Sequence, residues 1–389
     1  MLASICVLAA CGAPQRVLPA DPMDRARILL DEGRLLDAQQ AAEEVANRGD
    51  RAATLFVADI EIRLGQHTAA VQRLERAVMR WPGDGEVTYA LGRALDGAGK
   101  GDLALPHYAA WLKSHPGDVQ AALRMATLLL NRGDAAVGSA VCSAALQTHP
   151  DDVALLALYA RAMLARGRLP IALKAATRAT EIEPSATEGW LQLARIQLVA
   201  GERAAAIEAL EKLLAFDPQH VGALVLLGRI HLESGNPRLA MPILRRAVLI
   251  ARDDVVLLNL FAVALDGAGR SSEALKVLQR AIAQAPRLVV LRRNLAEMLL
   301  GSGEIDAAHD AAAGAVALAR ENAEHDESQA GERAAAEETL ARTVVARALL
   351  RAACAGERDS AAVLATIHAG LRAEGINIES DAVDRLGSN

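Results

Sequence analysis

Small, apolar and helix-stopping residues recur along the chain with a period of 34 residues. Eight segments of this length follow one another without a gap through residue 322 and begin at Arg51, Gly85, Val119, Val153, Thr187, Val221, Val255 and Val289. A fixed period of this size is typical of proteins built from one repeated supersecondary unit. Each short motif is therefore interpreted by its position within the repeat.

Four positions of the repeat predict a pair of antiparallel helices in each segment. Position 15 is always glycine, which tolerates the positive φ needed where a first helix ends. Positions 8 and 20 are always alanine or glycine, and such small side chains let helix backbones approach closely. Position 32 is proline in six of the eight segments, and proline cannot continue a helical hydrogen-bond ladder.

The same pattern resembles the tetratricopeptide repeat (TPR), whose 34-residue motif runs W-x2-L-G-x2-Y, A-x3-F and P. "WLQLARIQ" at 190–197 and "YALGRAL" at 89–95 match its first half, with Leu or Ala often replacing its aromatic residues. The resemblance implies an all-α TPR solenoid, and the composition agrees, since hydrophobic residues make up 52% but aromatics only 2%. A ninth unit with its turn at Gly33 precedes Arg51, so the solenoid is expected over residues 19–322.

The phase of the repeat breaks after residue 322. Residues 323–333 are polar and acidic and are expected to form a solvated linker or a frayed helical extension. Residues 334–375 resemble a degenerate helical pair and are interpreted as a terminal cap, because a solenoid must cover its last apolar face. Residues 376–389 are expected to be a flexible tail.

The recurring "LDGAG" at 95–99 and 265–269 is interpreted as the turn between the two helices of a repeat and not as a phosphate-binding loop. Gly99 and Gly269 fall at position 15, and no strand precedes them. A P-loop requires G-x-x-x-x-G-K-[ST] between a strand and a helix.

Charge and chemistry argue against catalysis. The net charge of −6 lacks the basic balance expected of a nucleic-acid binder. None of the nine histidines forms H-E-x-x-H or another metal-ligand spacing. Cys142 occupies a core position of its repeat, where a buried thiol is expected. We therefore expect a protein that is not an enzyme, with no catalytic residue, no metal, no cofactor and no small-molecule substrate.

The first 18 residues resemble a lipoprotein-type signal and tether. "MLASICVLAACGAPQ" contains a short apolar core, and Leu8-Ala9-Ala10-Cys11 resembles a bacterial lipobox. The resemblance implies acylation of Cys11 and, because Gly12 and not Asp follows, sorting to the outer membrane. An alternative is an apolar extension that packs on the first helix, with Cys11 as an ordinary thiol.

The first helices of a TPR solenoid line its concave groove, and by resemblance positions 2, 5, 9 and 12 point into it. Arginine recurs at position 9 and aliphatic residues at positions 5 and 12. The expected partner-binding residues are Tyr89, Arg93, Leu123, Leu130, Arg161, Leu164, Leu191, Arg195, Leu198, Val225, Arg229 and Leu232. Because arginine presents a planar donor fork to carboxylates, the predicted ligand is a segment with acidic and apolar side chains. The alternative is that these arginines are solvated surface residues and that the leucines only pack adjacent helices.

Together these features predict a protein-binding scaffold, anchored by lipid to the periplasmic face of an outer membrane. Its architecture resembles that of TPR lipoproteins that assist envelope machines such as type IV pilus secretins or polysaccharide export. That resemblance is at the level of the fold. The alternative is a cytoplasmic TPR adaptor or chaperone-like protein without lipidation.

Overall fold

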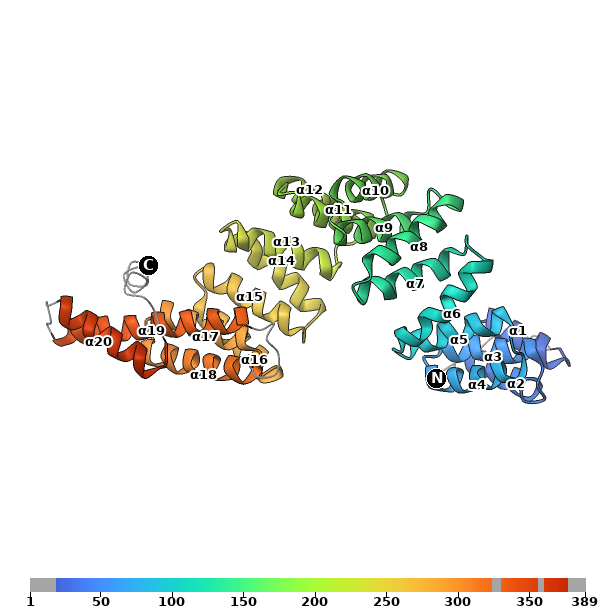
Figure 1. The fold of residues 1–389 in the computed structure, drawn as a ribbon, viewed down its shortest axis with the longest axis horizontal. Coiled ribbons are helices and arrows are strands. Elements are labelled where there is room, and N and C mark those ends of the chain that lie inside the picture. The colour runs from blue at the N-terminus through green and yellow to red at the C-terminus, as the bar shows by residue number, and fades with distance from the viewer. Residues whose placement is uncertain (1–18, 324–329, 356–359, 377–389) are drawn as a thin grey trace, which may run out of the picture. The chain divides into compact units, whose positions relative to one another are not determined.

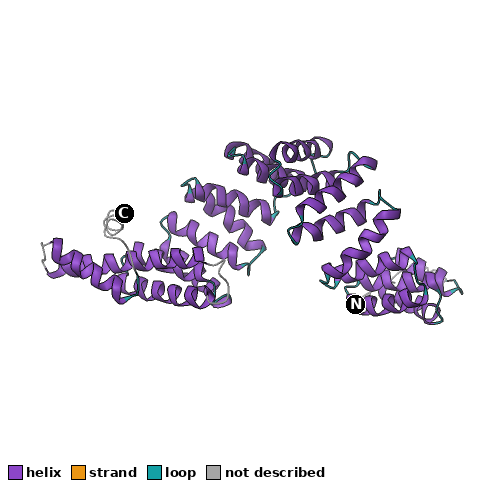
Figure 2. Cartoon of the chain, viewed as in Figure 1, coloured by secondary structure: helices purple, strands orange, loops and turns teal. Residues whose placement is uncertain are grey.

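The chain is a series of helical hairpins in a computed structural model that describes residues 19–323, 330–355 and 360–376. Every regular element in these ranges is a helix, as Figures 1 and 2 show. Helix contacts divide the chain into two compact units, residues 1–200 (unit 1) and 201–389 (unit 2). The predicted all-α class is confirmed over the described residues.

Unit 1 contains five helical pairs and one further helix. Its helices are α1 (Pro22–Asp31), α2 (Leu35–Asn47), α3 (Arg51–Arg63), α4 (His67–Arg80), α5 (Gly85–Gly97), α6 (Gly101–Ser114), α7 (Val119–Asn131), α8 (Ala135–Thr148), α9 (Val153–Ala165), α10 (Leu169–Ile182) and α11 (Thr187–Val199). Each helix from α1 to α10 contacts the next one along the chain. First helices of successive pairs also contact one another, as α3 does α5 and α7 does α9.

Unit 2 continues the same arrangement. Its helices are α12 (Arg203–Phe216), α13 (Val221–Glu233), α14 (Pro237–Ile250), α15 (Val255–Gly267), α16 (Ser271–Gln284), α17 (Val289–Gly301), α18 (Ile305–Ala323), α19 (Ala330–Ala355) and α20 (Ser360–Ala373). Two of the last three helices, α18 and α19, are longer than the others. Within the part of the chain that the structure describes, no helix is long and apolar enough to cross a membrane.

The glycines at position 15 turn the chain between the helices of each pair. All eight have positive φ, for example 73° at Gly99 and 83° at Gly303. After α5 the Gly99 amide donates to the Asp96 carbonyl (2.9 Å) and the Lys100 amide to the Leu95 carbonyl (2.9 Å). These bonds satisfy carbonyls that the helix end would leave open, as the sequence pattern predicts.

Carboxylates cap most of the first helices. The Leu155 amide donates to Asp152 Oδ1 at 2.8 Å, and the Leu257 amide donates to Asp254 Oδ1 at 2.9 Å. At α13 the cap is His220, whose Nδ1 accepts from the Ala223 amide at 3.0 Å. The acidic residues before the first helices therefore help to fix where those helices begin.

Alanine and leucine fill the space between helices. In unit 1, Ala94, Ala104 and Tyr108 belong to one core cluster that runs through several repeats, and all three are fully buried. At Gly92 an added Cβ would lie 2.9 Å from the Cβ of His107, and at Gly228 it would lie 2.5 Å from Leu244. Small residues at position 8 are thus required by close helix contact.

The last helices close the apolar end of unit 2. Ala336, Leu340 and Val344 of α19 pack against α18 in one buried cluster that also includes Ile376. α19 begins at Ala330, so it includes residues 330–333 of the range interpreted as a linker. Most of the predicted tail lies outside the described residues, and the proposed boundaries of these parts stay predictions.

Candidate functional site

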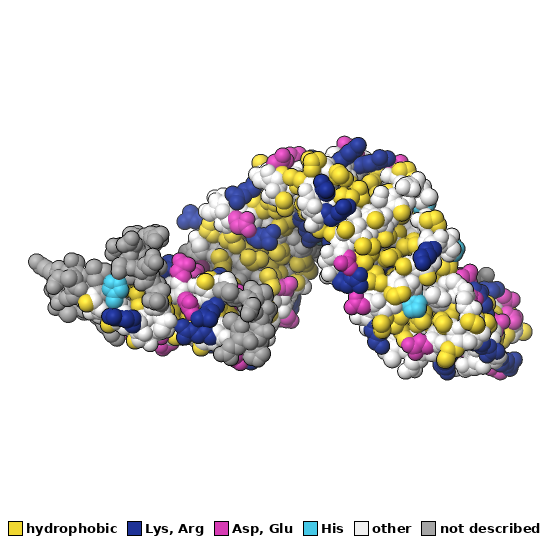
Figure 3. Space-filling view, in the orientation of Figure 1, with side chains coloured by type: hydrophobic (Ala, Val, Ile, Leu, Met, Phe, Trp, Pro, Cys, Tyr) yellow, Lys and Arg dark blue, Asp and Glu magenta, His cyan; other side chains and the backbone are white. Residues whose placement is uncertain are grey.

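The surface of the first helices in unit 1 carries two hollows. Figure 3 shows hydrophobic side chains gathered over the region of α7 and α9, with single basic residues among them. One hollow lies between α3 and α5, and the other lies along α7 and α9. Both belong to the face that the sequence predicts as the partner-binding groove.

The α3–α5 hollow has a volume of about 430 Å³ and an apolar floor. It is lined by Arg51, Ala52, Leu55, Phe56, Asp59, Ile62, Glu86, Tyr89, Ala90 and Arg93. Its arginines are already paired: Arg93 Nη1 lies 2.9 Å from Asp59 Oδ1, and Arg51 Nη2 lies 2.6 Å from Glu86 Oε2. Because these charges are balanced within the protein, the hollow suits an apolar side chain better than a carboxylate.

Arg51 also organises the start of α5. Its guanidinium donates to both carboxylate oxygens of Asp84, the residue that caps α5. The hydrogen bond from Arg51 holds the pKa of Asp84 at about 2, below its ordinary 3.8. The wall of the hollow is therefore fixed by a charge pair that joins one repeat to the next.

A row of stacked aromatic rings connects the α3–α5 hollow to α6. Tyr89, which lines it, stacks on Trp111 with ring centroids 4.7 Å apart, and Trp111 stacks on His115 at 3.7 Å. The Trp111 indole N–H donates to Asp118 Oδ2 at 2.7 Å. Burial raises the pKa of the Tyr89 hydroxyl. Stacking on Trp111 therefore holds the Tyr89 ring in one position in the wall of the α3–α5 hollow.

The α7–α9 hollow, of about 500 Å³, has a different chemistry. It is lined by Asp96, Gln120, Leu123, Arg124, Thr127, Leu128, Asn131, Ala154, Leu158, Arg161 and Glu188. Arg161 donates to the neutral amide oxygen of Asn131 at 3.0 Å, and Arg124 lies 3.9 Å from Asp96. Much of the donor capacity of these two guanidinium groups is unused within the described structure, so this hollow can accept a carboxylate.

Asp96 lines the α7–α9 hollow from α5, the helix that also lines the α3–α5 hollow. Tyr108 donates its hydroxyl proton to Asp96 Oδ2 at 3.1 Å. Burial, followed by the charge of Asp96, raises the pKa of Tyr108. The hydroxyl therefore stays a proton donor at neutral pH.

The expected groove residues do not all share one environment. Tyr89 and Arg93 line the first hollow, and Leu123 and Arg161 line the second. Leu130 of α7, Leu164 of α9 and Leu198 of α11 are half-buried, and Arg195 of α11 is exposed. Leu191 is buried, with 6% exposed, and it therefore supports α11 more than it offers contact area.

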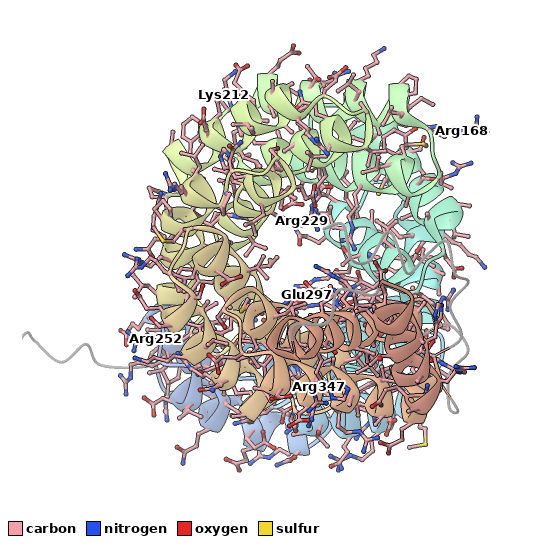
Figure 4. All side chains as sticks on the ribbon, turned by 90° about the vertical axis from the view of Figure 1, so that its left-hand side faces the viewer. Arg168, Lys212, Arg229, Arg252, Glu297 and Arg347 are labelled. Atoms are coloured by element: carbon pink, nitrogen blue, oxygen red, sulfur yellow. The ribbon has the colours of Figure 1, made fainter. Side chains whose placement is uncertain are left out.

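The remaining three expected groove residues belong to unit 2. Val225 and Leu232 are half-buried against its core, and Arg229 is exposed with Nε 3.6 Å from Glu233. Figure 4 shows Arg229 and Glu297 on one side of this unit and Lys212 and Arg252 on the opposite side. Arg229 belongs to α13 and Glu297 to α17, so these two first helices share that side of unit 2.

The sequence interpretation missed residues that line both hollows, among them Phe56, Asp59, Gln120 and Arg124. A signal for some of them is present at position 9, where Asp59 precedes Arg93 by one full repeat. Opposite charges at one position of consecutive repeats predict an ion pair, because equivalent residues of neighbouring first helices lie side by side.

Metal-ligating and thiol side chains show no reactive arrangement in the described ranges. No group of three or more His, Cys, Asp or Glu side chains there is arranged to hold a metal ion. Cys142 is fully buried, and burial raises its pKa to about 12. Cys11 and its surroundings lie outside the described residues.

Comparison with known proteins gives the same repeat. Three family models, each described as a tetratricopeptide repeat, match residues 23–85, 58–119 and 89–152 for the first, 153–196 for the second and 198–262 for the third. No curated protein sequence matches the chain.

Solved structures share the fold at low identity. A tetratricopeptide repeat protein from Parabacteroides merdae ATCC 43184 is 16% identical, with a TM-score of 0.53 over 63% of this chain and 97% of that chain. YrrB, described as a TPR protein with an unusual peptide-binding site, is 21% identical (TM-score 0.42), over 46% of this chain and 91% of its own. A thermophilic TPR protein from Thermus thermophilus is 22% identical (TM-score 0.39), over 46% of this chain and 98% of its own.

The family models together match residues 23–196 and 198–262, and the helical pairs follow the same 34-residue period. The chain therefore belongs to the tetratricopeptide repeat family.

Proposed function

We propose that this protein is a non-enzymatic scaffold that binds a segment of a partner protein along the first helices of unit 1. TPR proteins bind protein partners, and the two hollows supply a surface on which a partner segment could bind. The observation that carries the proposal is the contrast between the hollows. Each hollow is lined by two arginines and two carboxylates, but only in the α3–α5 hollow is each arginine closely paired with a carboxylate. In the α7–α9 hollow Arg161 donates to a neutral amide and Arg124 lies 3.9 Å from Asp96, so both have spare donors.

This contrast defines the partner segment. An apolar side chain would fill the α3–α5 hollow against Phe56 and Tyr89, and a carboxylate would bind Arg124 and Arg161 in the α7–α9 hollow. A rigid aromatic anchor beside a charged contact is the usual composition of an energetic hot spot.

Site-specific photocrosslinking in the native cell tests this proposal. A photoreactive residue at Gln120 should capture a discrete protein, and one at Lys174, on the outer helix α10, should not. Both side chains are exposed. Adducts at Gln120 should disappear in Arg124→Glu/Arg161→Glu and persist in the charge-matched Lys113→Glu/Lys174→Glu. Equal adducts in both double variants would contradict the assignment of the partner to this face.

We also propose that Cys11 is acylated and tethers the scaffold to the periplasmic face of an outer membrane, where it would assist assembly of an envelope machine. Support comes from Leu8-Ala9-Ala10-Cys11 and the apolar stretch before it. Two or more acyl chains are needed for stable anchoring.

Cell fractionation and the intact mass of the protein test the anchor. The native protein should start at an acylated Cys11 and sediment with outer membrane, and Cys11→Ala should not. If both proteins are soluble and keep Met1, the alternative of a cytoplasmic adaptor replaces this proposal. The groove proposal does not depend on this outcome.

A further inference from the structure

The solvent-facing side of α14 is basic and apolar at once. The helix contains three arginines and no acidic residue. Ala240, Leu244 and Ala247 face the core and are fully buried. The side opposite them, here called the α14 outer face, consists of Arg238, Leu239, Arg245, Arg246, Leu249 and Ile250, all exposed.

Large aliphatic side chains stand among the arginines. The exposed fractions are 54% for Leu239, 63% for Leu249 and 44% for Ile250. Residues three and four apart are neighbours on a helix surface, so Leu249 lies beside Arg245 and Arg246. A side chain of this size costs free energy when it is left in water, so several on one helix face indicate a contact.

The arginines of this face have no acidic partner in the described residues. Arg238 and Arg245 make no ion pair there, and Arg246 donates to the neutral carbonyl of Pro218 at 2.7 Å. The carboxylates that flank α14 along the chain have other partners: Asp217 Oδ1 accepts from the Gln219 amide at 3.0 Å, Asp253 pairs with Arg280 at 2.7 Å, and Asp254 caps α15. A local positive surface thus exists on a chain whose net charge is −6.

We propose that the α14 outer face docks on an anionic lipid surface. Its guanidinium groups would neutralise headgroup phosphates, and Leu239, Leu249 and Ile250 would enter the boundary between headgroups and acyl chains. An acidic protein could balance the arginines, but it would need matched pockets for three protruding aliphatic side chains. A bilayer takes them up without shape complementarity. Figure 4 shows Arg252, which follows α14, on the side of unit 2 opposite Arg229, so this contact would leave the first helices free.

Vesicle sedimentation of the full chain tests this docking. Every sample carries Cys11→Ala, so that acylation at this residue contributes nothing. Vesicles of phosphatidylcholine with phosphatidylglycerol should bind the protein, vesicles of phosphatidylcholine alone should bind it weakly, and added salt should reduce the binding. Arg238→Glu/Arg245→Glu should bind the anionic vesicles at least about tenfold more weakly.

Two further variants separate this mechanism from other causes. Lys113→Glu/Lys174→Glu changes the net charge by the same amount on exposed positions of unit 1, and it should bind like the parent. Leu239→Ser/Leu249→Ser should weaken binding about fivefold, because apolar insertion is lost while the charge is unchanged. Failure of the parent to bind anionic vesicles, or equal losses in both charge-reversed variants, would overturn the proposal and favour an acidic protein as the occupant of this face.

Discussion

Arg73 balances a buried carboxylate at the start of the solenoid. Its Nη2 lies 2.8 Å from Glu61 Oε1 and 3.0 Å from Glu43 Oε1, so one guanidinium joins α2, α3 and α4. The Glu61 side chain is only 2% exposed. Removing one partner of a buried pair leaves an uncompensated charge, which is costlier than replacing both partners by apolar groups.

Arg73→Ala should therefore lower the free energy of unfolding of unit 1 by about 3 kcal/mol or more. Urea unfolding followed by circular dichroism measures the loss. Arg73→Met/Glu61→Leu should recover most of it, because no buried charge remains. A loss below about 0.5 kcal/mol in the single variant, as for an exposed pair, would show that Glu61 is not held as described.

Cys142 illustrates how burial removes chemistry from a reactive residue type. With its pKa raised to about 12, the sulfur stays a thiol at neutral pH, and the thiolate is the nucleophile. In the variant Cys6→Ser/Cys11→Ser/Cys354→Ser, where Cys142 is the remaining thiol, a disulfide reagent should react only after urea unfolding. Rapid reaction of the native protein at neutral pH would contradict the buried position.

At the scale of elements, glycine placement controls the hairpins. Gly301 and Gly303 are two residues apart, and both have open space where a Cβ would lie. They differ in backbone conformation, because Gly303 has a φ of +83° and Gly301 ends α17. Alanine at either position therefore changes the backbone preference without creating a steric clash.

Gly303→Ala should destabilise unit 2 by about 1 kcal/mol, since left-handed backbone is unfavourable for residues with a Cβ. Gly301→Ala, the matched control, should be neutral or stabilise by up to about 1 kcal/mol, because alanine is the better helix former. Thermal unfolding of both variants measures the difference. Equal effects of the two substitutions would contradict the turn geometry.

The helical pairs were predictable because the residues that define them act locally. Glycine, proline and small residues set backbone angles and helix approach, and these requirements repeat with the sequence. Side-chain environments were less predictable because they depend on the neighbouring repeat. Leu123 and Leu191 share position 5, yet the first lines a hollow and the second is buried.

Position 9 shows the same dependence for charge. Arg93 pairs with Asp59 of the preceding repeat, whereas Arg161 follows Thr127 at that position and donates to Asn131 instead. The arginines at position 9 therefore differ in how many of their hydrogen-bond donors remain available to a ligand. The two hollows differ in chemistry for this reason, and no pattern within one repeat predicts it.

For the molecule as a whole, we propose different tasks for different faces. The first helices of unit 1 offer the hollows to a partner segment, and the α14 outer face of unit 2 offers charge and apolar surface to lipid. A scaffold gains from such a division, because neither contact competes with the other for the same residues.

Partner binding along the first helices is tested most simply by the affinity of the full chain for the segment that crosslinks at Gln120. Titration of the full chain with that segment, followed by calorimetry, would compare the parent with Arg124→Glu/Arg161→Glu and with Lys113→Glu/Lys174→Glu. We expect at least about a tenfold weaker affinity for the first variant, since charge-assisted hydrogen bonds are replaced by repulsion, and a parent-like affinity for the second. Equal affinity of all three proteins would contradict partner binding along the first helices.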